Sequence, residues 1–307
     1  LPAATDAQGT PLNLPAEWFL PSVHSMYFQL FSRLLALPMS NAQRDSLEQP
    51  RLLPLLDYLP IFDATSAVEQ PHGGRLLGLQ IPMAAHGSMG AAALASGSIG
   101  HAMETIARYA HIRNRLFDFE CRRDQDRVAL CLWPRIPLLD YSLFVQNVTV
   151  FAKFSIFKGL AHPADLQRAR LLLPWAAPEQ TTHPQADEVA CVYGAQVLGF
   201  DFPIEVAERP SALSDPNLYR LVCQAGDEEL EKLKGSVSAR VRHFLHAHQP
   251  QWPSLDQVAD TLSMSRRTLL RKLEAEKISY QQLLDEARNE LACWYLRQSG
   301  LPLGHVA

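Results

Sequence analysis

The fold of the C-terminal region is specified by one short segment, residues 262–273, which reads LSMSRRTLLRKL. Leu269 and Leu273 stand four residues apart, so a helix over this segment buries both on one face. The residues on its outward face are mostly basic or polar: Arg266, Arg267, Thr268, Leu270, Arg271 and Lys272. The pattern predicts a short helix with an apolar inner face and a basic outer face.

A second short helix is predicted just before this segment. Ser254 and Gln257 have the spacing of a capping box, in which each side chain bonds a free backbone amide of the other residue. Ala259 supplies the small side chain needed where two helices cross, and Ser263 occupies the turn between them. Two helices joined by such a turn form a helix-turn-helix unit. Glycine would suit the turn better, since another residue at positive φ costs roughly 1 kcal/mol.

Further helices are predicted on both sides of this unit. One spans about 238–247, and a long one begins at Ser279, which forms a second capping box with Gln282. The sequence 254–259, SLDQVA, is echoed by PLGHVA at 302–307. We therefore expect a second helix-turn-helix unit to begin there, and the sequence to hold only part of it.

The outward face of the 262–273 helix has the chemistry of a DNA-binding surface. Arg267 and Arg271 share one helix face, and a guanidinium can bond O6 and N7 of guanine together in the major groove. Arg266 and Lys272 can neutralise phosphates. The chain has a net charge of −4, whereas its residues after 235 hold nine Lys and Arg against seven Asp and Glu. A basic face that meets only solvent is the alternative, and the preceding helix and turn favour DNA.

The residues before 235 mix two periodicities and predict an α+β domain. Phe117, Phe119 and Cys121 alternate with polar residues, as do residues 128–132, so a β-hairpin is expected. Residues 141–158 fit either a buried helix or a strand. The other expected elements are an extended arm over 1–22, helices over 23–37, 52–59, 88–95 and from Ser98, strands over 171–175 and 200–202, and a helix after Asp215 with an apolar stripe at Leu218, Leu221, Val222, Ala225, Leu230 and Leu233.

Composition excludes several classes of protein. The 307 residues suggest two domains. With 47% hydrophobic and 20% charged residues, the chain is neither disordered nor a coiled coil or collagen. No apolar run approaches the roughly 18–20 residues that cross a bilayer. The five cysteines form no CxxC pair, which argues against a disulfide framework or zinc site and fits a reducing cytoplasm.

Two groups of residues have alternative interpretations. The first consists of four arginines near the predicted hairpin: Arg113, Arg115, Arg122 and Arg123. They could hold a carboxylate effector, although the solvent face of a hairpin is favoured. The second consists of three histidines: His243, His246 and His248. Their spacing fits a solvated helix better than a metal site. The sequence contains no GxSxG, HExxH or glycine-rich phosphate motif.

Residues 238–307 resemble the DNA-binding region of AraC-type transcription regulators, in which a long helix joins two helix-turn-helix units. The matching residues are 262–273 and 279–284, with Arg288, Ala292 and Leu296. Residues 86–110 and 200–218 resemble the effector-binding domain of the subgroup whose N-terminal part is called arabinose-binding. The matching residues there are Gly87, Gly90, Ala102, Tyr109, Phe202, Arg209, Pro210, Asp215 and Pro216. The expected domains are thus an arm over 1–22, an α+β effector-binding domain over 23–234 and a truncated, all-α helix-turn-helix domain over 236–307.

The resemblance implies a ligand-responsive, sequence-specific DNA-binding regulator of transcription that is not an enzyme. It places Arg267, Leu270 and Arg271 at base-reading positions. The residues predicted to contact DNA are Ser265, Arg266, Arg267, Thr268, Leu270, Arg271 and Lys272. Leu270 departs from the polar residue that some members have, and it can contact only a thymine methyl.

The resemblance also implies the partners of the chain. They are double-stranded DNA, a small-molecule effector of unknown identity, RNA polymerase and a second copy of the chain, in a cytoplasmic homodimer without cofactor, metal or membrane. The alternative, from a different class, is an enzyme or chemosensor domain tethered to a helical DNA-binding module. An enzyme would need a pocket with clustered titratable groups, and no spacing in the sequence points to one.

Overall fold

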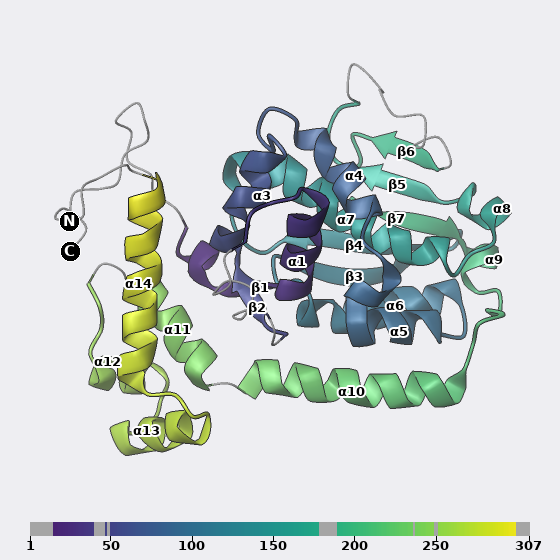
Figure 1. Cartoon of the computed structure of the whole chain (residues 1–307). Coiled ribbons are helices and arrows are strands. Elements are labelled where there is room, and N and C mark those ends of the chain that lie inside the picture. The colour runs from purple at the N-terminus through teal and green to yellow at the C-terminus, as the bar shows by residue number, and fades with distance from the viewer. Residues whose placement is uncertain are drawn as a thin grey trace. The chain divides into compact units, whose positions relative to one another are not determined.

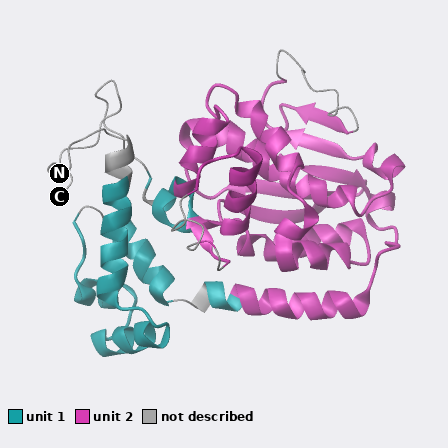
Figure 2. Cartoon of the chain, viewed as in Figure 1, with its two compact units in different colours: residues 1–21, 54–56, 231–307 teal, residues 22–53, 57–230 magenta. Residues whose placement is uncertain are grey.

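The computed structural model describes residues 15–39, 47, 50–177, 189–235, 237–248 and 251–298. The chain forms two compact units, which Figure 2 shows in different colours. We call residues 22–53 and 57–230 the α+β unit, and residues 1–21, 54–56 and 231–307 the helical unit. Within the described ranges, no helix is both long and apolar enough to cross a membrane.

A five-stranded sheet forms the centre of the α+β unit (Figure 1). Its strands, in spatial order, are β3 (Phe117–Arg123), β4 (Arg127–Pro134), β7 (Leu198–Pro203), β5 (Arg170–Leu173) and β6 (Ala190–Tyr193). Neighbouring strands are antiparallel except β5 and β6, which run parallel. The predicted hairpin and the two later strands are confirmed, and β6 is an addition to them.

One face of the sheet is apolar, because side chains along a strand alternate between its two faces and the apolar residues of β3 stand at every second position. Cys121 of β3 lies opposite Leu130 of β4, which lies opposite Phe200 of β7, so these three residues share a face. Asp118 and Glu120 occupy the other face of β3 and are exposed. The hairpin therefore has one core face and one solvent face.

Helix α7 (Ser142–Lys158) packs on the apolar face of the sheet. Residues 141–158, whose sequence fits either a buried helix or a strand, are therefore helical. The rings of Phe154 and Phe157 lie with their centroids 5.4 Å and 5.1 Å from that of Phe200. Residues on several sides of α7 are buried, including Lys153. Such a helix lacks the one-sided pattern of an amphipathic helix, and periodicity alone does not separate it from a strand.

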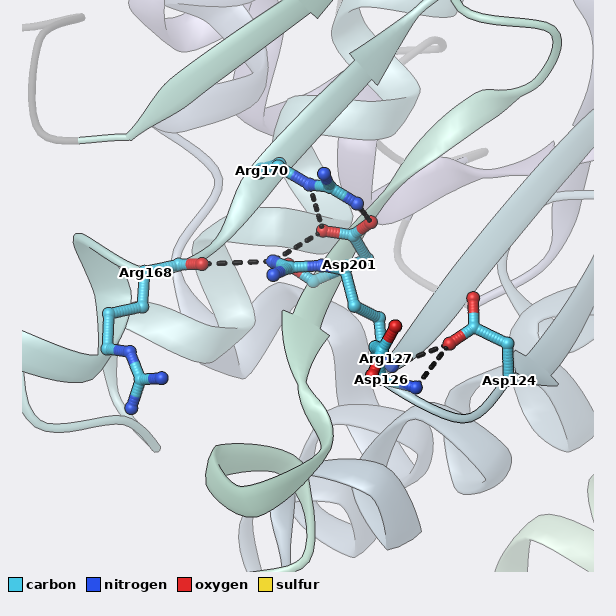
Figure 3. Close-up of polar contacts among 6 residues, drawn as sticks. All are labelled: Asp124, Asp126, Arg127, Arg168, Arg170 and Asp201. Carbon is cyan, nitrogen blue, oxygen red and sulfur yellow. Dashed lines mark hydrogen bonds and ion pairs between the residues drawn. The ribbon is translucent and has the colours of Figure 1, made fainter.

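An ion-pair network around Asp201 links three strands (Figure 3). The carboxylate of Asp201, in β7, accepts hydrogen bonds from Nε and Nη2 of Arg170 in β5, at 3.1 Å and 2.6 Å. Nη2 of Arg127 in β4 lies 2.8 Å from the same carboxylate and donates to the Arg168 carbonyl. Bidentate arginine–carboxylate pairs are directional, so the network holds β4, β7 and β5 in register.

The other elements before residue 236 are short apart from α10. The helices are α1 (Ser25–Leu34), α3 (Leu59–Ala64), α4 (Gly74–Leu79), α5 (Gly87–Leu94), α6 (Ile99–Tyr109), α8 (Pro163–Leu166), α9 (Ile204–Ala207) and α10 (Pro216–Gly235). The 3-10 helices are η1 (Ala16–Phe19), η2 (Leu55–Tyr58), η3 (Pro71–Gly73), η4 (Met83–His86), η5 (Ala110–Ile112) and η6 (Leu139–Tyr141). A second sheet pairs β1 (Pro21–His24) with β2 (Leu52–Pro54).

Most of the predicted early helices exist, with one exception. The helix over 88–95 and the helix capped by Ser98 are confirmed as α5 and α6. The helix predicted over 23–37 is shorter, because Val23 belongs to β1. The continuous helix predicted over 52–59 is wrong, since β2 and η2 occupy residues 52–58 and Leu59 is the first residue of α3. Pairing with β1 overrides the helical spacing of the leucines there.

The apolar stripe predicted for α10 is wrong in part: Val222, Leu230 and Leu233 are half-buried, but the other three residues are exposed and the helix packs through different residues. Leu218 and Leu221 are 44% and 64% exposed. Tyr109 of α6 packs so closely on Gly226 that an added Cβ would come within 2.9 Å of its ring. The hydroxyl of Tyr109 also donates to Asp227, at 2.9 Å. A close approach and a polar contact therefore select the packed face of α10.

The helical unit contains α11 (Val237–Ala247), α12 (Leu255–Thr261), α13 (Arg266–Ala275) and α14 (Tyr280–Gln298). The arm predicted over 1–22 lies outside the described residues as far as residue 14. Over Ala16–Phe19 the extended conformation is wrong, since η1 is helical and packs against α11, whereas Pro21 and Ser22 lie in the strand β1. Trp18 and Phe19 are buried, and the Phe19 ring stacks on His246. Burial of these two rings stabilises the turn. The predicted class, an α+β domain followed by helices, is confirmed.

Candidate nucleic-acid interface

Helices α12 and α13 form the predicted helix-turn-helix. Val258, Ala259, Leu269 and Leu273 belong to one core cluster, and each is at most 2% exposed. The backbone N–H of Met264 donates to the Ala259 carbonyl at 2.9 Å and closes the turn. The burial of both leucines, predicted from their spacing, is confirmed.

Each of these helices begins at a side-chain cap, which satisfies amides that the first turn leaves free. The capping box predicted for Ser254 and Gln257 is confirmed. At the start of α13, the Ser265 hydroxyl accepts the Thr268 N–H at 3.2 Å and lies 2.9 Å from the Thr268 hydroxyl. Two of the residues predicted to contact DNA are thus engaged with each other at the first turn of α13.

Ser263 adopts φ +55°, the left-handed conformation predicted for the turn. The Ser263→Gly variant should raise the melting temperature, with a gain of up to roughly 1 kcal/mol less the extra entropy of glycine in the unfolded chain. Circular dichroism during heating measures this change. Ser263→Ala keeps the strain and is the matched control. A glycine variant that melts below the alanine variant would contradict the argument.

The exposed side of α13 carries three cations without an ion pair or hydrogen bond to any residue in the described ranges: Arg267, Arg271 and Lys272. Leu270 lies on the same side and is 42% exposed. Arg266 differs, because its Nη1 lies 3.1 Å from Oδ2 of Asp256 on α12. Arg267 and Arg271 can therefore meet an external acceptor without losing an internal one, whereas Arg266 has to leave Asp256. No local pattern predicts that pair, since its members are ten residues apart and on different helices.

Two further helices brace α13. Glu276, which follows α13, accepts the N–H groups of Val237 and Ser238 at the start of α11, at 2.6 Å and 2.9 Å. A carboxylate at this end of a helix is stabilised by the helix dipole. Leu283 and Ala287 of α14 are fully buried in the same core as α13. Contacts with α11 and α14 therefore fix the inner side of α13 and leave its outward face exposed.

His246 corrects the interpretation of the three histidines as a solvated group. It lies on the inner side of α11, is fully buried, and its Nε2 is 3.3 Å from the Glu290 carboxylate on α14. His243 and His248 are exposed. In the part of the chain that is described, no three His, Cys, Asp or Glu side chains are grouped to hold a metal.

The four arginines near the hairpin separate into different environments. Arg122 pairs with Glu120 at 3.0 Å and Arg123 with Glu104 at 3.6 Å, all four on the surface. The favoured interpretation, a solvent face, holds for these two arginines. It is wrong for Arg113, which is 8% exposed. Arg113 lies outside the strands, after η5, so strand alternation does not govern it.

The long helix after α13 is described as far as Gln298. Its predicted capping box is confirmed: the Gln282 N–H donates to the Ser279 hydroxyl at 3.1 Å, and the Ser279 N–H donates to Gln282 Oε1 at 2.7 Å. The second helix-turn-helix unit predicted from the echo at 302–307 lies outside the described residues.

Known families and proteins resemble both parts of the chain. Residues 37–211 match the model of the arabinose-binding domain of AraC transcription regulators, N-terminal. The chain is similar to the Ornithine utilization regulator of Pseudomonas aeruginosa, with 28% identity over 308 residues that cover 97% of this chain and 90% of that protein. It is also similar to the HTH-type transcriptional regulator VqsM of the same organism, with 24% identity over 76% of this chain and 74% of VqsM.

A solved structure supports the fold. The transcriptional regulator CdpR from Pseudomonas aeruginosa superposes with a TM-score of 0.50 and 20% identity, over 96% of this chain and 90% of CdpR. The family model alone spans more than half of the chain. The chain therefore belongs to the AraC-type transcription regulators with an arabinose-binding-type N-terminal domain, and it is a DNA-binding regulator with an N-terminal ligand-binding domain.

Proposed function

We propose that α13 enters the major groove of a specific double-stranded DNA site, and that an effector bound by the α+β unit changes the affinity for that site. The observation that carries the proposal is the outward face of α13, where Arg267 and Arg271 have no partner among the described residues. An α-helix fits the width of the major groove. Regulation then requires only that the effector bind two states of the chain with different affinities.

Each residue of the predicted interface has a chemical role in this proposal. Arg267 and Arg271 bond guanine edges, and Leu270 contacts a thymine methyl. Lys272 neutralises a phosphate, as does Arg266 after it exchanges Asp256 for DNA. Ser265 and Thr268 hold the first turn of α13, whose N-terminal end favours an adjacent phosphate.

A gel-shift experiment tests the proposal. The chain is titrated onto DNA from the region upstream of its own gene at low salt, with and without cell extract as a source of effector. Unrelated DNA of the same length is the control. Tighter binding to the upstream DNA supports the proposal. Equal binding to the upstream and the unrelated DNA, both with and without extract, would contradict it.

Arg271→Ala should weaken specific binding by about 1–3 kcal/mol and relax the preference at one base pair, because it removes one bidentate contact. Binding to a set of single-base-pair substitutions in the DNA site measures this effect. Arg240→Ala removes the same charge from the exposed side of α11 and is the control. A uniform loss over all the DNA variants would show that Arg271 contacts only phosphate.

The family membership supports further parts of the proposal. We propose that the chain acts as a cytoplasmic homodimer and contacts RNA polymerase when bound to DNA. A dimer places two recognition helices on half-sites about one helical turn apart. Sedimentation of the protein with and without DNA measures the number of copies, and one copy under both conditions would contradict the dimer.

We also propose that the chain is not an enzyme and returns its effector unchanged. One relative is named Ornithine utilization regulator, so L-ornithine is one of the compounds to test. The protein is incubated with L-ornithine and with a metabolite mixture, and the mixture is then analysed by mass spectrometry. A compound that raises the melting temperature and is recovered unchanged supports a sensor. Its conversion into a product would favour the tethered enzyme.

A further inference from the structure

A buried basic cluster lies inside the α+β unit and consists of His86, Arg113 and Lys153. These residues come from η4, from the loop after η5 and from α7, and they are 0%, 8% and 2% exposed. Gly87 makes room for the cluster, since a Cβ at this position would overlap the Arg113 guanidinium. Burying cations is unfavourable unless anions or acceptors compensate them.

The described residues compensate this cluster only in part. The Nζ of Lys153 donates to the thioether sulfur of Met89 at 3.9 Å, a weak acceptor. It also lies 6.0 Å and 5.8 Å from the ring centroids of Tyr27 and Phe119. Among the described residues, the carboxylate that approaches Arg113 within an ion-pair distance is that of Glu229, at 4.0 Å. The three basic side chains thus have one described carboxylate near them, and it lies at the longest distance of an ion pair.

His24 of β1 cannot satisfy both of the donors beside it, one of which belongs to Arg113. The Nε2 of His24 lies 2.6 Å from Nη1 of Arg113, while its Nδ1 accepts the Met26 N–H at 3.1 Å. A neutral imidazole has a single acceptor nitrogen, so His24 cannot accept from both donors. Burial and the charge of Arg113 lower the pKa of His24 to about 4, which keeps the ring neutral.

The field of the cluster is positive. Burial and the charge of Arg113 lower the pKa of Lys153 to about 7. Burial, Lys153 and Arg113 together hold the pKa of His86 well below its usual value. Burial is the largest cause of each shift, and the charge of a neighbouring cation adds to it. An anion brought near the cluster would be attracted to it.

A pocket of about 600 Å³ opens beside this cluster in the same unit. His24 lines the pocket and also contacts Arg113, so it connects the pocket to the basic cluster. The other polar lining residues are Ser25, Gln29, Ser32 and Arg33, and the remaining lining residues are apolar. Among the described residues, the lining includes no Asp or Glu. Ser32 is 3% exposed, and its hydroxyl has no hydrogen-bond partner in the described residues.

We propose that this pocket is the effector site and that it takes a small molecule with an apolar body and one anionic group, with that group at the end formed by His24 and backed by Arg113. The inference rests on the proposed function only in calling the ligand an effector. Ser32 and Gln29 supply hydrogen bonds along the helix α1, and the apolar lining receives the body of the ligand. The basic cluster behind the pocket disfavours a cation in this place.

Three probes of six carbon atoms each test the charge requirement on the full chain: hexanoate, hexyl phosphate and hexanamide. Titration calorimetry should detect binding of at least one of the two anions, and its affinity should exceed that of the neutral amide by about tenfold or more, the usual gain of a hydrogen bond to a charged group. The preferred anion identifies the headgroup as carboxylate or phosphate. Equal affinity of all three probes, or no binding of either anion at millimolar concentration, overturns the proposal.

Two variants locate the site. Arg113→Met should lower the affinity for the anion by about tenfold or more and leave the weak affinity for the amide unchanged. Ser32→Leu fills the pocket and should abolish binding of the anion, which keeps the test available if Arg113→Met does not fold. Arg122→Met removes an exposed arginine of the same unit and should leave the affinity unchanged. Unaltered anion binding by Ser32→Leu overturns the assignment to this pocket. A gel shift on ligand-free protein tests DNA binding separately, so either inference can fail alone.

Discussion

Leu269→Ala should unfold or loosen the helical unit and abolish specific DNA binding, at a cost of about 2–5 kcal/mol. Leu269 is fully buried in the core that also contains Val258 and Leu273. Truncating it removes apolar contacts and leaves a cavity between α12 and α13, so the outward face of α13 loses its support. Chemical denaturation of the full chain, followed by hydrogen exchange, measures both the loss and its location.

The neighbouring residue provides a matched control for this variant. Leu270 is 42% exposed, so Leu270→Ala removes the same atoms with little cost in stability. It should alter only the contact with a thymine methyl. Equal destabilisation by the two variants would contradict the assignment of Leu269 to the core and Leu270 to the outward face.

Asp201→Ala should destabilise the α+β unit by about 2–3 kcal/mol, less than the full cost of breaking a buried pair because Arg170 stays partly exposed. The side chain of Asp201 is 5% exposed, while those of Arg127 and Arg170 are 19% and 43% exposed. Without the carboxylate, two cations remain beside each other at the centre of the sheet. Denaturant unfolding monitored by the tryptophan fluorescence of the chain gives the difference in free energy.

A surface pair of similar chemistry is the control for Asp201. Glu205 pairs with Arg168, and both side chains are about half exposed. Glu205→Ala should leave the unfolding midpoint almost unchanged, since exposed ion pairs contribute little. A loss for Glu205→Ala as large as that for Asp201→Ala would show that the buried network does not hold the sheet.

The helix-turn-helix could be predicted from the sequence because its signals are local. The capping box of Ser254, the left-handed turn at Ser263 and the spacing of Leu269 and Leu273 all lie within one short segment. The hairpin was predictable for the same reason, since strand alternation shows within a few residues. Local rules suffice where the side chains that fix a structure are neighbours in the sequence.

The errors arise where distant residues determine the packing. The buried face of α10 depends on Tyr109, which lies more than a hundred residues before Asp227. The burial of His246 depends on Glu290 and on Phe19, from two other segments. Lys153 within an apolar run was a signal that the sequence offered, because a lysine in a buried helix needs a reason. That Lys153 lies close to Arg113 could be seen only in the tertiary structure.

The ratio of affinities for upstream and unrelated DNA of equal length tests whether α13 reads bases. Fluorescence anisotropy at one fixed salt concentration gives this ratio for the native chain and for the Arg267→Ala/Arg271→Ala variant. The native chain should prefer the upstream DNA by about 10³-fold or more, whereas the variant should keep salt-dependent binding but lose most of the preference. A native ratio near one, or a variant that keeps the native ratio, would contradict recognition of DNA through α13.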